Sequence, residues 1–308
     1  MYATLIAVAV VWGGASGLLL PRAAYRLSVE PGEPWRNSCP AGHPITGPAR
    51  GWLGGTRCAG CDVAAVPSGT AESPASSTLG AETGAEEPRA EEPRAETARA
   101  AAAAPTTPAP HAAPAPHRPS TPHVPHVPYA PSRLVPLLTA LVCAALAAST
   151  GPRPELAVWL LLTPLAVLLA LVDRNVHRLP DHLTLPLAVA AVVLLGLAAL
   201  LPGDGGSWPA ALLGGLALGA CYFVLFLINP NGMGFGDVKL AVPLGVTLGW
   251  YGWPVLCVGA FAGFLFGSLY GLGLMLLRRA GRKSAIPFGP FMITGALVGI
   301  VLGGVAAA

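Results

Sequence analysis

Apolar and polar positions are distributed very unevenly along this chain of 308 residues. Residues 1–20 form an uncharged apolar run, residues 21–133 are polar, and residues 134–308 are apolar except for short polar turns. A helix that crosses the hydrocarbon core of a bilayer needs about 20 predominantly apolar residues. The pattern therefore predicts an all-α polytopic membrane protein.

We expect about eight transmembrane helices, because Gly, Pro and charged turns divide the apolar residues into eight segments. The run from Leu240 to Leu277 carries no charge and is too long for one span, so we divide it at residues 252–254 (GWP). The second and sixth segments are short. The eight segments are Tyr2–Leu20, Leu134–Ala148, Leu156–Val172, Leu183–Leu201, Ala210–Ile228, Leu240–Tyr251, Val255–Leu277 and Pro290–Ala308.

The basic residues predict how these helices are oriented. If the N-terminus lies outside, 17 of the 18 Lys and Arg residues fall in segments on the inner side, and Arg153 is the exception. Inner loops of membrane proteins carry such an excess of basic residues. Residues 1–20 lack the basic residues that precede the apolar core of a signal peptide, so we expect a retained anchor. Both termini are then outside the cytoplasmic membrane.

Composition narrows the class of protein further. The chain is 53% hydrophobic and 11% charged, whereas soluble domains carry about 25% charged residues. An ordinary soluble enzyme and a wholly disordered chain are both excluded. The net charge of only +3 gives no indication that the protein binds nucleic acid. A short basic cluster at residues 278–283 could contact anionic membrane lipid or serve only to fix the topology.

The polar region contains two different segments. Residues 21–61 form an expected inner, cytosolic loop, in which Cys58 and Cys61 have the two-residue spacing of a zinc knuckle. Cys39 and His43, in a CxxxH rather than a CxxC pattern, could supply the other two ligands of a structural zinc ion. The alternative is three reduced thiols and an uninvolved histidine. Residues 62–133 are rich in Pro, Ala and Glu and contain a direct repeat (EEPRA), which predicts a disordered linker.

Carboxylates in the apolar part are the candidates for chemistry, because a charged group at membrane depth is costly and usually functional. Residues 134–308 contain five acids. Glu155 and Asp204 fall in outer loops, where we expect water to solvate them. Asp173, Asp181 and Asp237 fall at the inner face.

Two of the inner aspartates can form a catalytic dyad. Two carboxyls in contact share one proton, so that one acts as a base on water and the other as an acid on the scissile amide. Gly234 and Gly236 permit close approach of a substrate strand to Asp237, and Lys239 can offset negative charge nearby. The alternative for Asp237 is an acidic residue that stabilises a helix N-terminus.

Three segments resemble the motifs of type IV prepilin peptidases. Residues 234–240 (GFGDVKL) resemble the family's GxGD motif, and residues 173–184 (DRNVHRLPDHLT) resemble its other aspartate motif. Residues 286–291 (IPFGPF) are similar to a late Pro-Phe-Gly-Pro segment. The motifs occur in the family's order, on a chain with eight expected spans and a cysteine-containing loop after the first.

The resemblance implies an intramembrane aspartic endopeptidase of residues 134–308, a domain of seven helices. It would remove the basic leader of prepilins or pseudopilins at the cytosolic face, without a cofactor. Asp173 and Asp237 match the family's catalytic aspartates, and Pro180 and Asp181 match supporting positions. Many members also methylate the new N-terminus with S-adenosylmethionine. Their loop usually has two CxxC pairs, a pattern from which this chain departs, so the second activity stays open.

Two other functions are compatible with the sequence. A transporter could use Asp173 and Asp237 to relay protons or bind cations, but transporters place such groups near the bilayer midplane. A non-catalytic assembly factor could recruit partners through the Pro-rich linker. Deleting residues 62–133 would abolish the function of an assembly factor, whereas Asp→Asn changes would abolish that of a peptidase.

Overall fold

The computed structural model describes residues 2–30, 32–56, 58, 61, 132–230, 232–277 and 287–307. Regular structure in these ranges is helical, apart from one isolated bridge between Ser38 and Pro44. The described residues belong to one compact unit. The expected linker at residues 62–133 lies almost wholly outside them.

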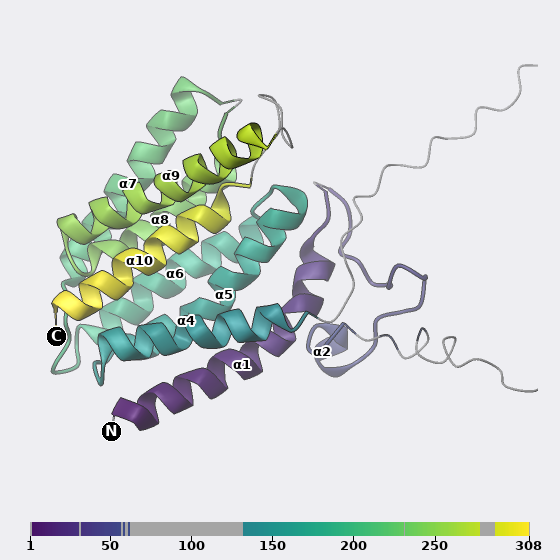
Figure 1. Cartoon of the computed structure of the whole chain (residues 1–308), viewed down its shortest axis with the longest axis horizontal. Coiled ribbons are helices and arrows are strands. Elements are labelled where there is room, and N and C mark those ends of the chain that lie inside the picture. Colours follow the sequence, from purple (N-terminus) through teal and green to yellow (C-terminus); the bar gives the residue numbers. More distant parts are fainter. Residues whose placement is uncertain are drawn as a thin grey trace, which may run out of the picture. The chain divides into compact units, whose positions relative to one another are not determined.

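Eight long helices occupy the positions of the eight expected spans (Figure 1). Six of them are long and apolar enough to cross a membrane, while α4 is a shorter apolar helix and α8 has 15 residues. The all-α, multi-pass prediction is confirmed. The helices are α1 (Tyr2–Leu27), α4 (Leu134–Thr150), α5 (Glu155–Val176), α6 (Asp181–Ala198), α7 (Trp208–Ile228), α8 (Phe235–Gly249), α9 (Trp253–Leu276) and α10 (Gly289–Ala306), with a four-residue α2 (Pro48–Gly51).

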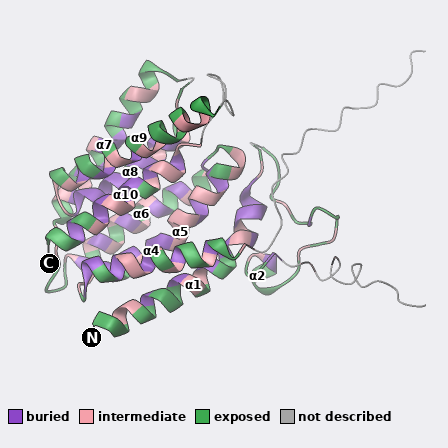
Figure 2. Ribbon diagram, in the orientation of Figure 1, coloured by how far each residue is buried: buried purple, intermediate pink, exposed green. Residues whose placement is uncertain are grey.

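Helix α8 lies at the centre of the bundle (Figure 2). It packs against α6, α7, α9 and α10, and most of its residues are buried. At a rise of 1.5 Å per residue it is only about 22 Å long. Neighbouring helices, rather than lipid, surround most of this short helix.

Glycines let α7 approach α8 closely. A Cβ atom on Gly214 would lie 2.6 Å from the carbonyl oxygen of Gly245, and one on Gly245 would lie 2.5 Å from the carbonyl oxygen of Gly214. Small residues at such contacts allow the backbones of membrane helices to touch. This contact fixes the position of α8, and with it the residues at its N-terminal end.

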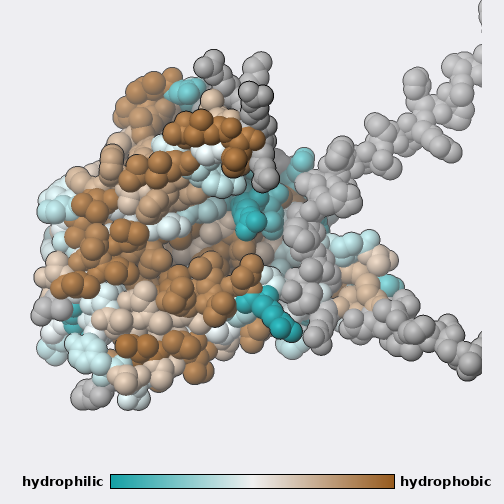
Figure 3. Space-filling view, in the orientation of Figure 1, coloured by the Kyte–Doolittle hydropathy of each residue, from teal (hydrophilic) through white to brown (hydrophobic). Residues whose placement is uncertain are grey.

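One end of the helix bundle holds the two chain termini, and the other end holds many of the hydrophilic side chains. Tyr2 at the start of α1 lies beside Gly151 after α4, and Arg153 donates a hydrogen bond of 2.6 Å to the carbonyl of Gly304 near the end of α10. The start of α1 and the end of α10 are therefore at one end (Figure 1). Hydrophilic side chains gather at the opposite end, beside α2, while apolar side chains cover the helices (Figure 3).

The structure corrects the expectation that water solvates Glu155. This side chain is completely buried, 3.6 Å from Arg153, and accepts a hydrogen bond of 3.2 Å from the N–H of Gly205. The connection between α6 and α7 folds over the start of α5 and removes water from it. Asp204, one residue away in that connection, is exposed as expected.

Candidate active site

Asp173 lies in the last turn of α5, where its side chain is only 4% exposed. Its Oδ2 atom accepts a hydrogen bond of 3.0 Å from the backbone N–H of Gly289, the first residue of α10. Free N–H groups at a helix N-terminus favour a negative charge. A Cβ atom on Gly289 would lie 2.8 Å from the same oxygen, so a larger residue would displace the carboxyl.

Asp237 lies in the first turn of α8 and is 8% exposed. Its Oδ2 atom accepts a hydrogen bond of 3.2 Å from the backbone N–H of Gly234, which closes the loop before the helix. A Cβ atom on Gly236 would lie 3.0 Å from the Cβ of Leu179, in the connection between α5 and α6. The glycines of the GxGD motif thus let that connection pack onto the start of α8.

The structure brings Asp173 and Asp237 to the same end of the bundle, near enough for their charges to interact. Neither forms an ion pair within the described residues, where the two ion pairs are Arg153–Glu155 and Lys239–Asp181. Two buried carboxyls without an ion-pair partner resist ionising together, although His177 partly favours the charged form of Asp173, so they are suited to sharing a proton. The fold therefore places together the two residues that the motifs single out.

Asp181 has a different environment from the two buried aspartates. It is the first residue of α6, after Pro180, and its side chain is 54% exposed. The Nζ atom of Lys239 lies 2.6 Å from its Oδ1 atom, and also 5.0 Å from the centre of the Phe235 ring. Lys239 thus offsets the charge of Asp181, and the pair joins α6 to α8 beside the buried carboxyls.

Tyr222 is a neighbour of the site that the sequence analysis did not single out. It is 2% exposed on α7, stacks on Phe264 with ring centres 5.4 Å apart, and interacts electrostatically with Asp237. Its distance from Gly219 in the sequence is the one feature that could have indicated its position. Tyr222 follows Gly219 by three residues, so it lies on the glycine face of α7 that packs on α8.

The four predicted metal ligands also come together. Their ligand atoms all lie within 4.8 Å of one another. The Sγ atoms of Cys39 and Cys61 are 3.8 Å apart, and the Nδ1 atom of His43 lies 3.6 Å and 3.4 Å from them. Zinc–ligand bonds of about 2.3 Å to sulfur and 2.0–2.1 Å to nitrogen give tetrahedral edges of about 3.8 and 3.6 Å. The donor set therefore fits zinc.

The thiols in this cluster differ in acidity. Burial alone would raise the pKa of Cys39, but hydrogen bonds from the backbone N–H groups of Ala41 and His43 lower it to about 6. Desolvation and the neighbouring Cys39 and Cys58 thiols raise the pKa of Cys61 to about 11. Negative charge already held on one thiol thus opposes ionisation of the next.

Two arginines hold the loop that carries these ligands. Helix α1 continues to Leu27, beyond the expected end at Leu20, and buries Arg22 and Arg26 in its last turns. Arg22 donates to the carbonyls of Thr46 and Leu53. Arg26 donates to the Arg50 carbonyl and to Asn37 Oδ1. In the sequence these arginines indicate only the topology, whereas in the structure each also donates to backbone carbonyls of the Cys/His loop.

Comparisons with known proteins agree with the motifs. The profile of the type IV leader peptidase family matches residues 160–276, a range that contains both buried aspartates. The chain is 35% identical over 171 residues to a prepilin leader peptidase/N-methyltransferase of Aeromonas salmonicida (strain A449), covering 55% of this chain and 57% of the relative. The corresponding protein of Pseudomonas aeruginosa is 33% identical over 175 residues, covering 55% of this chain and 58% of the relative.

The prepilin leader peptidase/N-methyltransferase of Bacillus subtilis (strain 168) is 29% identical over 170 residues, covering 54% of this chain and 64% of the relative. The chain thus spans somewhat more than half the length of these curated relatives. No solved structure matches. Residues 160–276 are thus similar to the type IV leader peptidase family, which is the family that the three motifs resemble.

Proposed function

We propose that this protein is an intramembrane aspartic endopeptidase that removes the leader peptide of prepilins or pseudopilins. The observation that carries the proposal is the pair of buried carboxyls, Asp173 and Asp237, at one end of a multi-pass helix bundle. The relatives, which are named prepilin leader peptidase/N-methyltransferase, supply the substrate class.

The chemistry follows from one proton shared between two carboxyls. The ionised carboxylate takes a proton from water, and the resulting hydroxide attacks the carbonyl carbon of the scissile amide. The protonated carboxyl donates its proton to the carbonyl oxygen. When the tetrahedral intermediate collapses, the C–N bond breaks and the proton held by the first carboxyl passes to the leaving amine. One hydroxyl proton of the intermediate returns to the second carboxylate as the carbonyl re-forms. No covalent bond to the enzyme forms.

We propose that the aspartates face the cytosol and that both termini lie outside. The Lys and Arg distribution supports this orientation, because 17 of 18 basic residues fall in segments expected on the inner side. Arg153, just before α5, contacts the end of α10, whereas Asp173, in the last turn of α5, contacts the start of α10, so the C-terminus lies at the end of the bundle opposite Asp173. A cut at this face would separate a basic leader from the apolar helix that follows it.

A cleavage assay tests the proposal. A prepilin with a basic leader, a Gly-Phe junction and an apolar helix is co-expressed with wild type, Asp173→Asn or Asp237→Asn protein. Gel shift and the mass of the new N-terminus report cleavage. We expect cleavage by wild type only, with both variants present at normal levels in the membrane. Asp204→Asn is the matched control, because this exposed aspartate lies away from the site.

Full activity in either buried-aspartate variant would contradict the dyad. If a well-expressed wild type cleaves no prepilin, the result would instead favour a transporter in which the same aspartates relay protons or bind cations. Their position at one end of the bundle, rather than at mid-depth, favours the peptidase.

We further propose that Cys39, His43, Cys58 and Cys61 hold a structural zinc ion. The spacing of their ligand atoms supports this. Zinc would supply a cross-link for a loop that α1 otherwise holds by its two arginines. It takes no part in peptide cleavage.

The names of the relatives raise a second activity, methylation of the new N-terminus with S-adenosylmethionine as donor. Incubating the purified protein and a prepilin with a methyl-labelled donor tests it directly. A label on the cleaved product would add the second activity, and a cleaved product without the label would exclude it.

A further inference from the structure

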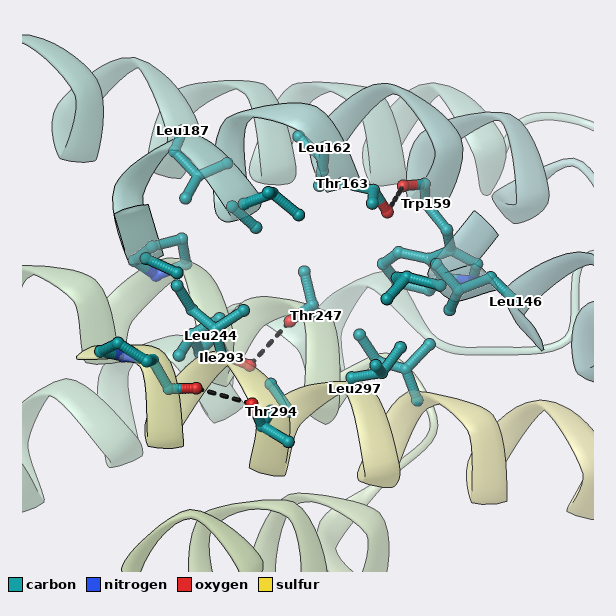
Figure 4. Close-up of a pocket in the computed structure, with 18 of the residues that line it drawn as sticks. Leu146, Trp159, Leu162, Thr163, Leu187, Leu244, Thr247, Ile293, Thr294 and Leu297 are labelled. Atoms are coloured by element: carbon teal, nitrogen blue, oxygen red, sulfur yellow. Dashed lines mark hydrogen bonds between the residues drawn. The ribbon is translucent and has the colours of Figure 1, made fainter. Parts of the chain in front are cut away.

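A cavity of about 330 Å³ lies among α4, α5, α6, α8 and α10 (Figure 4). Side chains from all five helices point into it, and nearly all are apolar. Those that define its walls include Leu146, Trp159, Leu187, Leu244, Ile293 and Leu297. The proposed cleavage reaction does not use this space.

The hydroxyl groups in the walls are bonded to their own helices, and the one charged lining residue, Arg174, lies at one end of the cavity. The hydroxyl groups of Thr163, Thr247 and Thr294 donate to the backbone carbonyls of Trp159, Leu244 and Pro290 at 2.7–2.9 Å, as the dashed lines in Figure 4 show. Their protons are therefore not available to a ligand. The cavity is suited to an apolar occupant whose own polar groups are already paired.

One end of the cavity lies beside Asp173. Arg174 and Pro290 line it, and they directly follow Asp173 and its hydrogen-bond donor Gly289 in the chain. Trp159 lines the far end and precedes Arg174 by four turns of α5, which is about 22 Å along the helix. The cavity thus begins beside the site and runs into the depth of the bundle.

The cavity opens toward the side of the bundle rather than into water alone. Leu138 of α4 lines it and is 55% exposed, and Thr294 of α10 lines it and is exposed as well. On a membrane-spanning bundle such side surfaces face lipid. An occupant can therefore arrive within the plane of the membrane, between α4 and α10.

We propose that this cavity receives side chains of the apolar helix that follows the leader in the substrate. The inference rests on the proposed function. A helix satisfies its own backbone hydrogen bonds, so it can lie against apolar walls at membrane depth. Because the cavity begins beside Asp173, we favour the substrate helix over a lipid acyl chain as its occupant. A lipid would not need a site that leads to the carboxyls. Docking here would bring the junction between leader and helix to the aspartates.

Filling the cavity tests the proposal. Ala166 lines it two turns from Asp173, and Ala220 on α7 is exposed outside it, so Ala166→Phe and Ala220→Phe form a matched pair. Each variant is assayed with a full prepilin and with a peptide that ends shortly after the junction and lacks the apolar helix. For Ala166→Phe we expect the ratio of kcat/KM for prepilin to that for peptide to fall about tenfold or more.

The ratio should be unchanged in Ala220→Phe. An unchanged ratio in Ala166→Phe would overturn the proposal, including the case in which both substrates are lost equally. Wild type must cleave the prepilin in the same assay. If it does not, the proposed function fails rather than the docking site.

Cross-linking provides a second test that does not depend on activity. Thr294→Cys is compared with Ala220→Cys in a chain that carries Asp237→Asn, Cys221→Ala and Cys257→Ala, with a prepilin that has one cysteine in its apolar helix. A thiol cross-linker should join the prepilin to residue 294 and not to residue 220. Equal capture at both positions, or none at residue 294, would contradict docking in the cavity.

Discussion

The backbone N–H of Gly289 donates a hydrogen bond to Asp173 and so ties the start of α10 to the end of α5. This contact gives a physical reason for the late Pro-Phe-Gly-Pro segment. Its glycine begins a helix directly against a buried carboxyl, where a Cβ atom would lie 2.8 Å from the carboxyl oxygen. The segment belongs to the site although it lies outside the range that the family profile matches.

Gly289→Ala should therefore reduce prepilin cleavage by about tenfold or more, because the methyl group displaces the carboxyl from its position. Gly273→Ala on α9 is the control, since a Cβ atom there meets nothing within 4 Å. Initial rates with matched amounts of membrane protein check the prediction. Equal rates for the two variants would show that the position of Asp173 tolerates this shift.

Asp181→Asn should lower the cleavage rate by less than about tenfold, because its partly exposed ion pair with Lys239 contributes at most about 1 kcal/mol. Asp173→Asn should abolish cleavage in the same assay. The comparison separates a residue that supports the site from one that performs the reaction. Complete loss in Asp181→Asn would place Asp181 in the dyad instead.

Glu155→Leu should destabilise the protein by about 3–5 kcal/mol, because it leaves the largely buried Arg153 without its charge partner. Thermal unfolding of the purified protein in detergent measures the loss. Asp204→Leu, at an exposed position, should change the stability by no more than about 0.5 kcal/mol. Replacing both members, as Arg153→Met with Glu155→Leu, should recover part of the loss. Additive effects would argue against a coupled pair.

The purified wild type should contain about one zinc ion per chain, and Cys58→Ser or His43→Ala should lower this content strongly, because each removes one of four ligands. Elemental analysis by mass spectrometry provides the measurement. Cys257→Ser, on α9 and away from the cluster, should leave the content unchanged. A wild type free of zinc after purification without chelators would favour the interpretation as reduced thiols.

The sequence by itself determined the helices and the candidate chemistry. Apolar length is a local property, so all eight long helices could be predicted, six of them long enough to cross a membrane, with boundaries that shifted by at most five residues except at the end of α1. The motifs at residues 173–184 and 234–240 identified the family and the aspartates. The prediction that Asp173 and Asp237 catalyse cleavage remains for the assay to decide.

Tertiary structure decided which polar groups are buried and what they contact. Glu155 was expected in water, but the connection between α6 and α7 covers it, and hydropathy along the chain carries no information on such coverage. Arg22 and Arg26 bind a loop that follows them, and Tyr222 lies near enough to Asp237 to interact with its charge because glycines bring α7 onto α8. The apolar cavity beside Asp173 likewise exists only where five helices meet, since no single segment determines the space left between them.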